Sequence, residues 1–285
     1  MKFSHDSIEA FNDGLFTPEV GAWAENKYEI LHHYNHMFAT GMKNRFDNRV
    51  YIDLFSSAGI SQIRDTNRFV LTSSLIAMNL PDPYNQYIYC DIDKKCIEAL
   101  SQRVEKYFPG RKTYYIVGDC NEKATEILSL LPKPSKSNTV LTFCVVDLFN
   151  LGINFETMKT LNKYRMDFLI LLSWMDATRN EYIYINPTNE RIDNFLGDKK
   201  WREKWSELKK ENYDFRKFLA EEFVQRMMAL GYPDTAFKTL FPVRSTDKKL
   251  FLYHLAFFSK SEKGYDFWKK ARLGGPKQTS LDFKD

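Results

Sequence analysis

Residues 50–59 read VYIDLFSSAG, a short apolar run rich in β-forming residues that ends in a turn of small residues. Apolar runs of this length, bounded by turn residues, are typical of buried strands. Similar runs recur along the chain, and most of them are followed closely by an aspartate. The predicted strands are Val50–Phe55, Gln86–Cys90, Lys112–Val117, Thr139–Val146, Met166–Trp174 and Leu250–Phe258.

Helical patterns lie between these strands. Apolar residues recur at three- and four-residue spacing over Lys94–Tyr107, Asn121–Leu131 and Phe155–Tyr164. Near-continuous apolar strands that alternate with helices predict an α/β fold with a mostly parallel, doubly wound, Rossmann-like sheet. The predicted divisions are an N-terminal helical extension over 1–48 with a helix at Trp23–Met42, an α/β domain over 49–273 with a polar helical insertion at about 187–230, and a flexible tail over 274–285.

The composition is typical of a globular protein. The chain has 285 residues, of which 44% are hydrophobic, and its net charge of +4 permits nucleic-acid binding without requiring it. No apolar run approaches the roughly 20 residues that span a bilayer, and the N-terminus lacks the apolar segment of a secretion signal. The four cysteines form no C-x-x-C pair, so we expect buried reduced thiols and no metal site. A cytoplasmic protein without a membrane partner is the expectation.

Acidic residues accompany successive predicted strands. Asp53 lies within the first strand, and Asp91, Asp119 and Asp147 close the next three. Ligands of open parallel sheets bind beyond the carboxyl ends of the strands. This arrangement suits S-adenosylmethionine (SAM). A small-residue loop can lie close to its methionine moiety, while the acids accept hydrogen bonds from the ribose hydroxyls and the adenine amino group. The residues predicted to bind SAM are Asp53, Phe55, Ser56, Ser57, Ala58, Gly59, Asp91, Ile92, Asp119, Cys120 and Asn121.

Two other interpretations apply to these acids and loops. An aspartate at a strand end often caps the following helix, and Asp119 with Glu122 has the spacing of a capping box. A dinucleotide-binding loop would need G-x-G-x-x-G, whereas residues 56–61 supply one glycine. The chain also lacks GxxxxGK[ST], which disfavours a P-loop nucleotide hydrolase.

A series of short motifs extends over nearly the whole chain. Its segments are Lys27–Leu31, Asp53–Gly59, Thr72–Ala77, Gly118–Asn121, Phe143–Phe149, Arg191–Gly197, Tyr253–Lys260 and Lys263–Trp268. Their order resembles that of the three-Cys-motif partner proteins, the TcmP family. A serine-alanine pair and Leu148 stand where the family has a proline-glycine and a proline. The cysteines in that family name belong to its partner, so none of the cysteines of this chain takes a role from the resemblance.

The resemblance implies a class I SAM-dependent methyltransferase-type domain that works with a three-Cys-motif partner protein. The family is also similar to adenine-N6 methyltransferases of ribosomal RNA, which use a D-P-P-[YF] segment. Asp147-Leu148-Phe149 is a shortened version of that segment. Asp147 is therefore the expected acceptor for the target amino group, and Phe149 the expected stacking partner of an extruded base.

Basic residues in two regions are candidates for substrate binding. Lys27 and His32 lie on the helix before the first strand. Lys199, Lys200 and Arg202 are interleaved with tryptophans in the predicted insertion, a pattern that suits phosphate contact and base stacking. The alternative is an amphipathic helix that buries those tryptophans and turns its charges outward.

The C-terminal tail suggests one further partner. Gln278-TSLDF-Phe283 resembles the Q-x-x-L-x-F peptide with which bacterial proteins dock on the sliding clamp. Gln278 would bind polar groups, while Leu281 and Phe283 would enter apolar pockets. A preceding glycine-glycine-proline would keep the peptide free of the domain.

The sequence thus favours a SAM-dependent methyltransferase that acts on a nucleic-acid base, with the adenine amino group preferred. The alternative is a catalytically silent SAM- or nucleotide-binding accessory subunit of a partner protein. A nuclease is a third possibility, and it would require the strand-end acids to converge on a metal.

Overall fold

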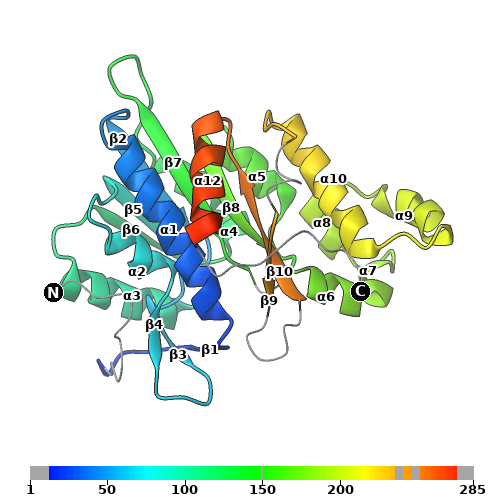
Figure 1. Ribbon diagram of the computed structural model, residues 1–285, viewed down its shortest axis with the longest axis horizontal. Coiled ribbons are helices and arrows are strands. Elements are labelled where there is room, and N and C mark those ends of the chain that lie inside the picture. The colour runs from blue at the N-terminus through cyan, green and yellow to red at the C-terminus, as the bar shows by residue number, and fades with distance from the viewer. Residues whose placement is uncertain (1–12, 149, 235–239, 245–250, 275–285) are drawn as a thin grey trace.

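The computed structural model describes residues 13–148, 150–234, 240–244 and 251–274 of the chain. Its centre is a seven-stranded sheet with the order β6-β5-β2-β7-β8-β10-β9, which confirms the predicted α/β class (Figure 1). A three-stranded sheet, β1-β3-β4, lies apart from it. The strands are β1 (Glu19–Val20), β2 (Asn48–Asp53), β3 (Ile60–Ile63), β4 (Phe69–Leu71), β5 (Gln86–Asp91), β6 (Thr113–Val117), β7 (Val140–Val146), β8 (Met166–Leu172), β9 (Phe241–Arg244) and β10 (Phe251–Phe258).

The order of the strands reverses at β2. This strand pairs in parallel with β5 on one side and with β7 on the other. The chain builds one half of the sheet through β5 and β6, then crosses back to add β7 and β8. Strand β10 is antiparallel to both β8 and β9. The prediction of a mostly parallel, doubly wound sheet is therefore confirmed, with one antiparallel strand near its edge.

Helices cover both faces of the large sheet. One face carries α1, α2, α3 and α12, and the other carries α4, α5, α6, α8 and α10, with α9 packed on α10. Figure 1 shows α1 and α12 side by side over the first of these faces. The helices are α1 (Ala24–Met42), α2 (Ser73–Met78), α3 (Lys94–Tyr107), α4 (Cys120–Ser129), α5 (Phe155–Leu161), α6 (Trp174–Arg179), α7 (Glu181–Tyr184), α8 (Arg191–Leu196), α9 (Trp201–Lys210), α10 (Phe215–Ala229) and α12 (Glu262–Gly274).

The alternation of side chains along each strand divides the core into two parts. Val50 and Ile52 of β2 pack beneath α4 and its neighbours, whereas Tyr51 between them packs beneath α1. All three side chains are fully buried, as expected for a strand covered on both faces. Tyr51 adjoins Phe143 of β7, with ring centroids 6.0 Å apart. The face beneath α1 is thus an aromatic layer.

Helix α12 closes this aromatic layer. Trp268 is fully buried and stacks on Phe257 of β10, with ring centroids 5.5 Å apart. A Cβ atom on Gly41 of α1 would lie 2.5 Å from the ring of Phe267, so glycine at this position lets the two helices approach closely. The last turns of the chain that the structure describes are therefore part of the domain core.

Three features differ from the sequence prediction. The strand predicted to end at Trp174 ends at Leu172, and Trp174 begins α6. The small β1-β3-β4 sheet and β9 were not predicted, because runs of two to four residues carry no clear alternation.

In the part of the chain that the structure describes, no helix is long and apolar enough to cross a membrane.

Candidate cofactor and acceptor site

Three of the predicted acids lie at one edge of the sheet. Asp53 and Asp91 are the last residues of β2 and β5, and Asp147 directly follows β7. Because β2 pairs in parallel with both neighbours, the carboxyl ends of these strands meet where the strand order reverses. This is the position at which doubly wound sheets bind ligands.

The loop after β2 is fastened to the end of β5. The backbone N–H of Ser56 donates to the carbonyl oxygen of Cys90 at 3.0 Å. The N–H of Ser57 donates to Asp91 Oδ2 at 2.8 Å. Ser57 has a φ of 54° and Gly59 a φ of 84°, so the loop turns through conformations that most residues avoid. The Asp91 carboxylate thereby fixes the loop that is predicted to lie against the cofactor.

The Asp53 carboxyl group lies beneath this loop and is enclosed. Its side chain is fully buried, where it accepts hydrogen bonds from the Tyr51 hydroxyl and the Phe55 N–H, each at 3.3 Å. Burial raises the pKa of Asp53 to about 7, and the nearby Asp147 carboxylate adds to the rise. Asp53 therefore supports the edge from below and is close to half-protonated at neutral pH.

The surface beside Asp91 carries exposed apolar side chains. Ile92 is 73% exposed and Val117, at the end of β6, is 43% exposed. Burial raises the pKa of Asp91, and the hydrogen bonds from Ser57 and Asp93 to its two oxygens act in the opposite direction. Each oxygen keeps a lone pair free of these bonds. The Ser56 hydroxyl is buried and finds no hydrogen-bond partner among the described residues.

The third predicted segment has a structural role. Asp119 caps α4, because its Oδ1 accepts from the Asn121 N–H at 2.8 Å, as the capping interpretation of this aspartate expects. Cys120 is buried against the core. The Asn121 side chain is occupied by loop contacts: its Nδ2 donates to the Gly152 carbonyl, and its Oδ1 accepts from the Asn154 N–H. The side chains of Asp119 and Asn121 therefore make structural contacts within the protein.

Asp147 forms an ion pair with Lys27. The Lys27 Nζ lies 2.5 Å from Asp147 Oδ2, and the side chains are 13% and 16% exposed. Burial opposes the charge on Lys27, yet the Asp147 carboxylate, with contributions from Tyr28 and Tyr253, raises the pKa of Lys27 above its usual value. Sequence analysis selected both residues, but it did not pair them, since 120 positions separate them.

This ion pair lies on a cavity of about 380 Å³. The wall opposite α1 is formed by the end of β8 and by α6, which begins inside the predicted fifth strand. The carboxyl end of the predicted fifth strand could have indicated this wall, because the neighbouring strands end at the same edge of the sheet. The lining residues that sequence analysis missed are Trp23, Leu171, Ser173, Asp176, Arg179, Asn180 and Tyr253.

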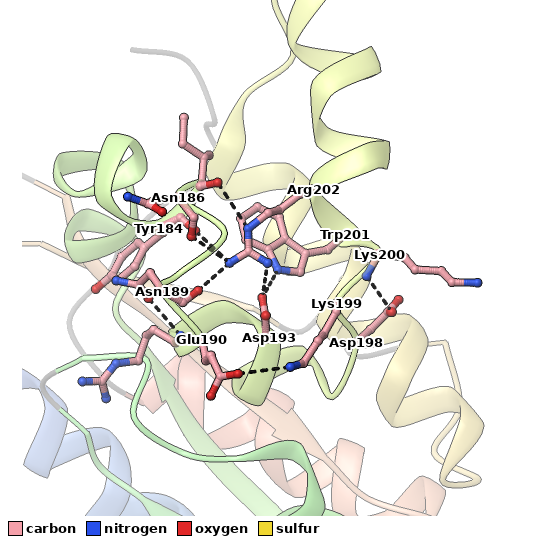
Figure 2. A network of polar contacts seen from close by, with 12 residues as sticks. Tyr184, Asn186, Asn189, Glu190, Asp193, Asp198, Lys199, Lys200, Trp201 and Arg202 are labelled. Carbon is pink, nitrogen blue, oxygen red and sulfur yellow. Dashed lines mark hydrogen bonds and ion pairs between the residues drawn. The ribbon is translucent and has the colours of Figure 1, made fainter.

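The basic residues of the insertion lie apart from this cavity and differ among themselves. Arg202 is held inside the insertion, where its guanidinium donates to Asp193 and to several backbone carbonyl oxygens (Figure 2). Lys199 is exposed and pairs with Glu190 at 3.1 Å, and Lys200 is exposed. Arg202 therefore organises the insertion, and Lys199 and Lys200 remain accessible.

Helix α9 has the character given by the amphipathic alternative. Trp201 is fully buried and Trp205 is 4% exposed, so neither ring is available to stack on a base. Trp201 Nε1 donates to Asp193 Oδ1 at 2.8 Å, which satisfies the buried indole (Figure 2).

The remaining predicted residues are placed as follows. His32 is partly exposed on α1, with its ring 6.5 Å from that of His36. Phe149 lies outside the described residues, as do Gln278, Leu281 and Phe283 of the proposed clamp peptide. Among the residues that the structure describes, no three histidine, cysteine or acidic side chains gather as a metal site would require.

Arg103 is a residue that sequence analysis missed. It is fully buried on α3 and pairs with Asp13 through Nε at 2.8 Å. Its Nη1 donates to the carbonyl oxygens of Phe16 and Ala58, at 2.9 and 2.6 Å. The side chain therefore ties the loop after β2 to the segment that precedes α1. No local pattern distinguishes this arginine from an exposed helical one.

Comparison with known proteins adds the fold alone. No family model matches the chain, and no curated protein matches it. The chain superposes on the Legionella pneumophila protein LPL1258, described by the family model DUF519, with a TM-score of 0.50 and 12% identity over 86% of this chain and 89% of that one. An O-methyltransferase from Bacillus cereus in complex with SAH gives a TM-score of 0.47 and 9% identity over 87% and 85% of the two chains.

Removing the Arg103 guanidinium is expected to destabilise the protein strongly. Arg103→Met leaves the Asp13 carboxylate buried and unpaired, and we expect the free energy of unfolding to fall by about 3 to 5 kcal/mol. Urea unfolding followed by circular dichroism measures the change. Lys94→Met on the same helix is the matched control, since Lys94 is 74% exposed and pairs only with Glu98 at the surface. Equal stability of the two variants would contradict a structural role for Arg103.

Asp53 is expected to make the protein less stable as the pH rises towards neutrality. The folded state holds a proton up to a pKa of about 7, whereas the unfolded state releases it near 3.8, so the free energy of unfolding falls between these values. Between pH 5 and 8 this contribution amounts to about 2 to 3 kcal/mol. Asp53→Asn should reduce the fall in the free energy of unfolding between pH 5 and 8 by that amount, as measured by urea unfolding. Asp65→Asn, at an exposed turn, should leave the dependence unchanged.

Proposed function

We propose that this chain is a SAM-dependent methyltransferase that acts on the amino group of a nucleic-acid base, with adenine preferred. The observation that carries the proposal is the meeting of two half-sites at one sheet edge. The Ser56–Gly59 loop and Asp91 form the first, and Asp147 with its cavity forms the second. The reversal of strand order at β2 brings them together.

The first half-site fits SAM. The two Asp91 oxygens keep lone pairs that can accept hydrogen bonds from the vicinal hydroxyls of a ribose. The exposed side chains of Ile92 and Val117 offer apolar contact to an adenine ring. The unpartnered hydroxyl of Ser56 remains available beneath the loop. Asp91, Ile92 and the Ser56–Gly59 loop would thus hold the cofactor.

Asp147 has the chemistry needed beside the acceptor. When bound, SAM supplies a methyl group activated by a positively charged sulfur. The Asp147 carboxylate accepts a hydrogen bond from the amino group of the base, which raises the electron density on the nitrogen. Lys27 keeps this carboxylate in place before the base arrives, and the base must then replace or share the contact with the lysine ammonium.

The second half-site also suits a base joined to a phosphate backbone. Trp23, 38% exposed, lines the cavity and offers an aromatic face for a flipped base. Arg179 also lines the cavity and is exposed, and it forms no ion pair with another described residue. A free guanidinium at this position is suited to a phosphate. Phe149 stays a predicted second stacking partner.

An accessory role is the second candidate, and the Lys27–Asp147 ion pair favours it. A carboxylate that is permanently bound to an ammonium would not accept a base. In that case the domain would bind SAM without transferring its methyl group, and the three-Cys-motif partner implied by the family resemblance would supply the activity. The two candidates share the cofactor site and differ at Asp147.

Binding of SAM should depend on Asp91. Calorimetric titration of the purified protein is expected to show binding of SAM and S-adenosylhomocysteine but not of NAD. Asp91→Asn should weaken the binding at least tenfold, because it removes the charge and one acceptor for the ribose hydroxyls. Asp93→Asn is the matched control, since Asp93 caps α3 and asparagine caps helices equally well. Folded wild-type protein that binds neither compound would refute the cofactor assignment.

Methyl transfer should depend on Asp147. With labelled SAM and DNA or RNA acceptors, Asp147→Asn is expected to lower the transfer rate at least 100-fold while changing SAM affinity less than threefold. Asp82→Asn is the control, because Asp82 also pairs with a lysine, Lys43, but remote from the cavity. Undiminished transfer by Asp147→Asn would exclude Asp147 from the reaction. A wild-type protein that binds SAM and transfers no methyl group would favour the accessory role.

A further inference from the structure

A second cavity lies at the opposite edge of the sheet, with a volume of about 520 Å³. It is bounded by the end of α1, by Leu141 and Asp167 at the starts of β7 and β8, and by the start of α12. Lys27, at the other end of the 19-residue α1, contacts Asp147. A helix of this length spans about 28 Å, so the two cavities are separate sites.

Aromatic side chains form the walls of this cavity. Phe38 is buried, while Phe46 and Phe267 are partly exposed within it. The guanidinium of Arg165 lies 5.3 Å from the centre of the Phe46 ring. The ring of Phe267 is held in position by its close approach to Gly41. Partly exposed rings around a cavity of this size provide stacking surfaces for a planar ligand.

A buried carboxyl group lies in the same cavity. Asp167 lines it and is only 4% exposed. Burial raises the pKa of Asp167 to about 7, against the effects of a hydrogen bond from Ser259 and of Arg165. A single hydroxyl partner leaves acceptor capacity on a carboxylate. Asp167 can therefore accept a hydrogen bond from a ring N–H or amino group that enters the cavity.

The rim of the cavity is positively charged. Arg45, Arg165 and Lys263 line it from three parts of the chain, and Glu262 is the one exposed acid among the described lining residues. None of the three cations forms an ion pair with another residue that the structure describes. Arg165 also lies over the Phe46 ring and acts on Asp167, and together the three cations attract an anion and can contact its oxygens.

We infer that this cavity binds a nucleoside phosphate. Its base stacks against Phe46 and Phe267, an amino or ring N–H group of the base donates to Asp167, and its phosphate lies between Arg45 and Arg165. The volume falls within the roughly 300 to 1,000 Å³ of small-molecule sites. The assignment does not rest on the proposed methyl transfer, because none of its residues belongs to the other site.

Calorimetric titration with AMP, GMP, CMP and UMP at low ionic strength tests this site, with saturating S-adenosylhomocysteine present to fill the first site. We expect at least one mononucleotide to bind with a stoichiometry of one, and the matching nucleoside and inorganic phosphate to bind at least tenfold more weakly. Arg165→Ala and Arg45→Ala should each weaken binding at least tenfold. A 5′-phosphorylated oligonucleotide and its 5′-hydroxyl form distinguish a strand end from a free nucleotide.

Lys199→Ala provides the control for loss of one surface charge, because Lys199 is exposed and distant in the insertion. It should bind the mononucleotide as the wild type does. Asp167→Asn should change the preference among the four bases, since an amide presents both a donor and an acceptor. Failure of all four mononucleotides to bind, or binding that Arg165→Ala and Arg45→Ala leave intact, would overturn the assignment. A mononucleotide that binds without S-adenosylhomocysteine but not in its presence would also overturn the assignment, because the nucleotide would then occupy the first site.

Discussion

The parallel pairing of β2 with both β5 and β7 is the constraint on which the site depends. Strand β2 pairs with a neighbour on each side and is covered by helices on both faces, so it is an interior strand of the sheet. With β2 there, the chain must build outward first on one side and then on the other. The carboxyl ends of the three strands consequently meet at one edge, and Asp53, Asp91 and Asp147 meet with them.

Hydrogen bonds then convert this edge into a fixed shape. Asp91 holds the N–H of Ser57, and Arg103 holds the carbonyl of Ala58 from beneath. The positive φ of Ser57 would be costly without such restraints, whereas glycine adopts the positive φ of Gly59 readily. The fixed loop presents its backbone to a ligand at little further entropic cost, since ordering has already occurred on folding. The same carboxylate thus shapes the loop and keeps lone pairs for a ligand.

The sequence predicted those features that have a local pattern. The apolar run from Val50 and the similar runs after it were enough to predict a mostly parallel α/β sheet, and the aspartates that accompany them placed a candidate site at the carboxyl ends of its strands. Features made by distant residues had no such pattern. The Lys27–Asp147 pair joins positions 120 apart, and Arg103 looks like any helical arginine until its burial is known. At Trp201 the basic and aromatic pattern fitted both an interior and a binding surface, and its burial agrees with the amphipathic interpretation.

Helix α1 links the two edges of the sheet. Its first turns carry Lys27 to Asp147, and its last turns carry Phe38 and Met42 to the second cavity. Between them the helix is packed on the aromatic layer and against α12, so it moves as a rigid element if it moves at all. Displacement of Lys27 by a base would therefore be absorbed by the lysine side chain, whose flexible stem can swing while the helix stays in place. Opening of the Lys27–Asp147 ion pair would therefore leave the core undisturbed, as the proposed acceptor role of Asp147 requires.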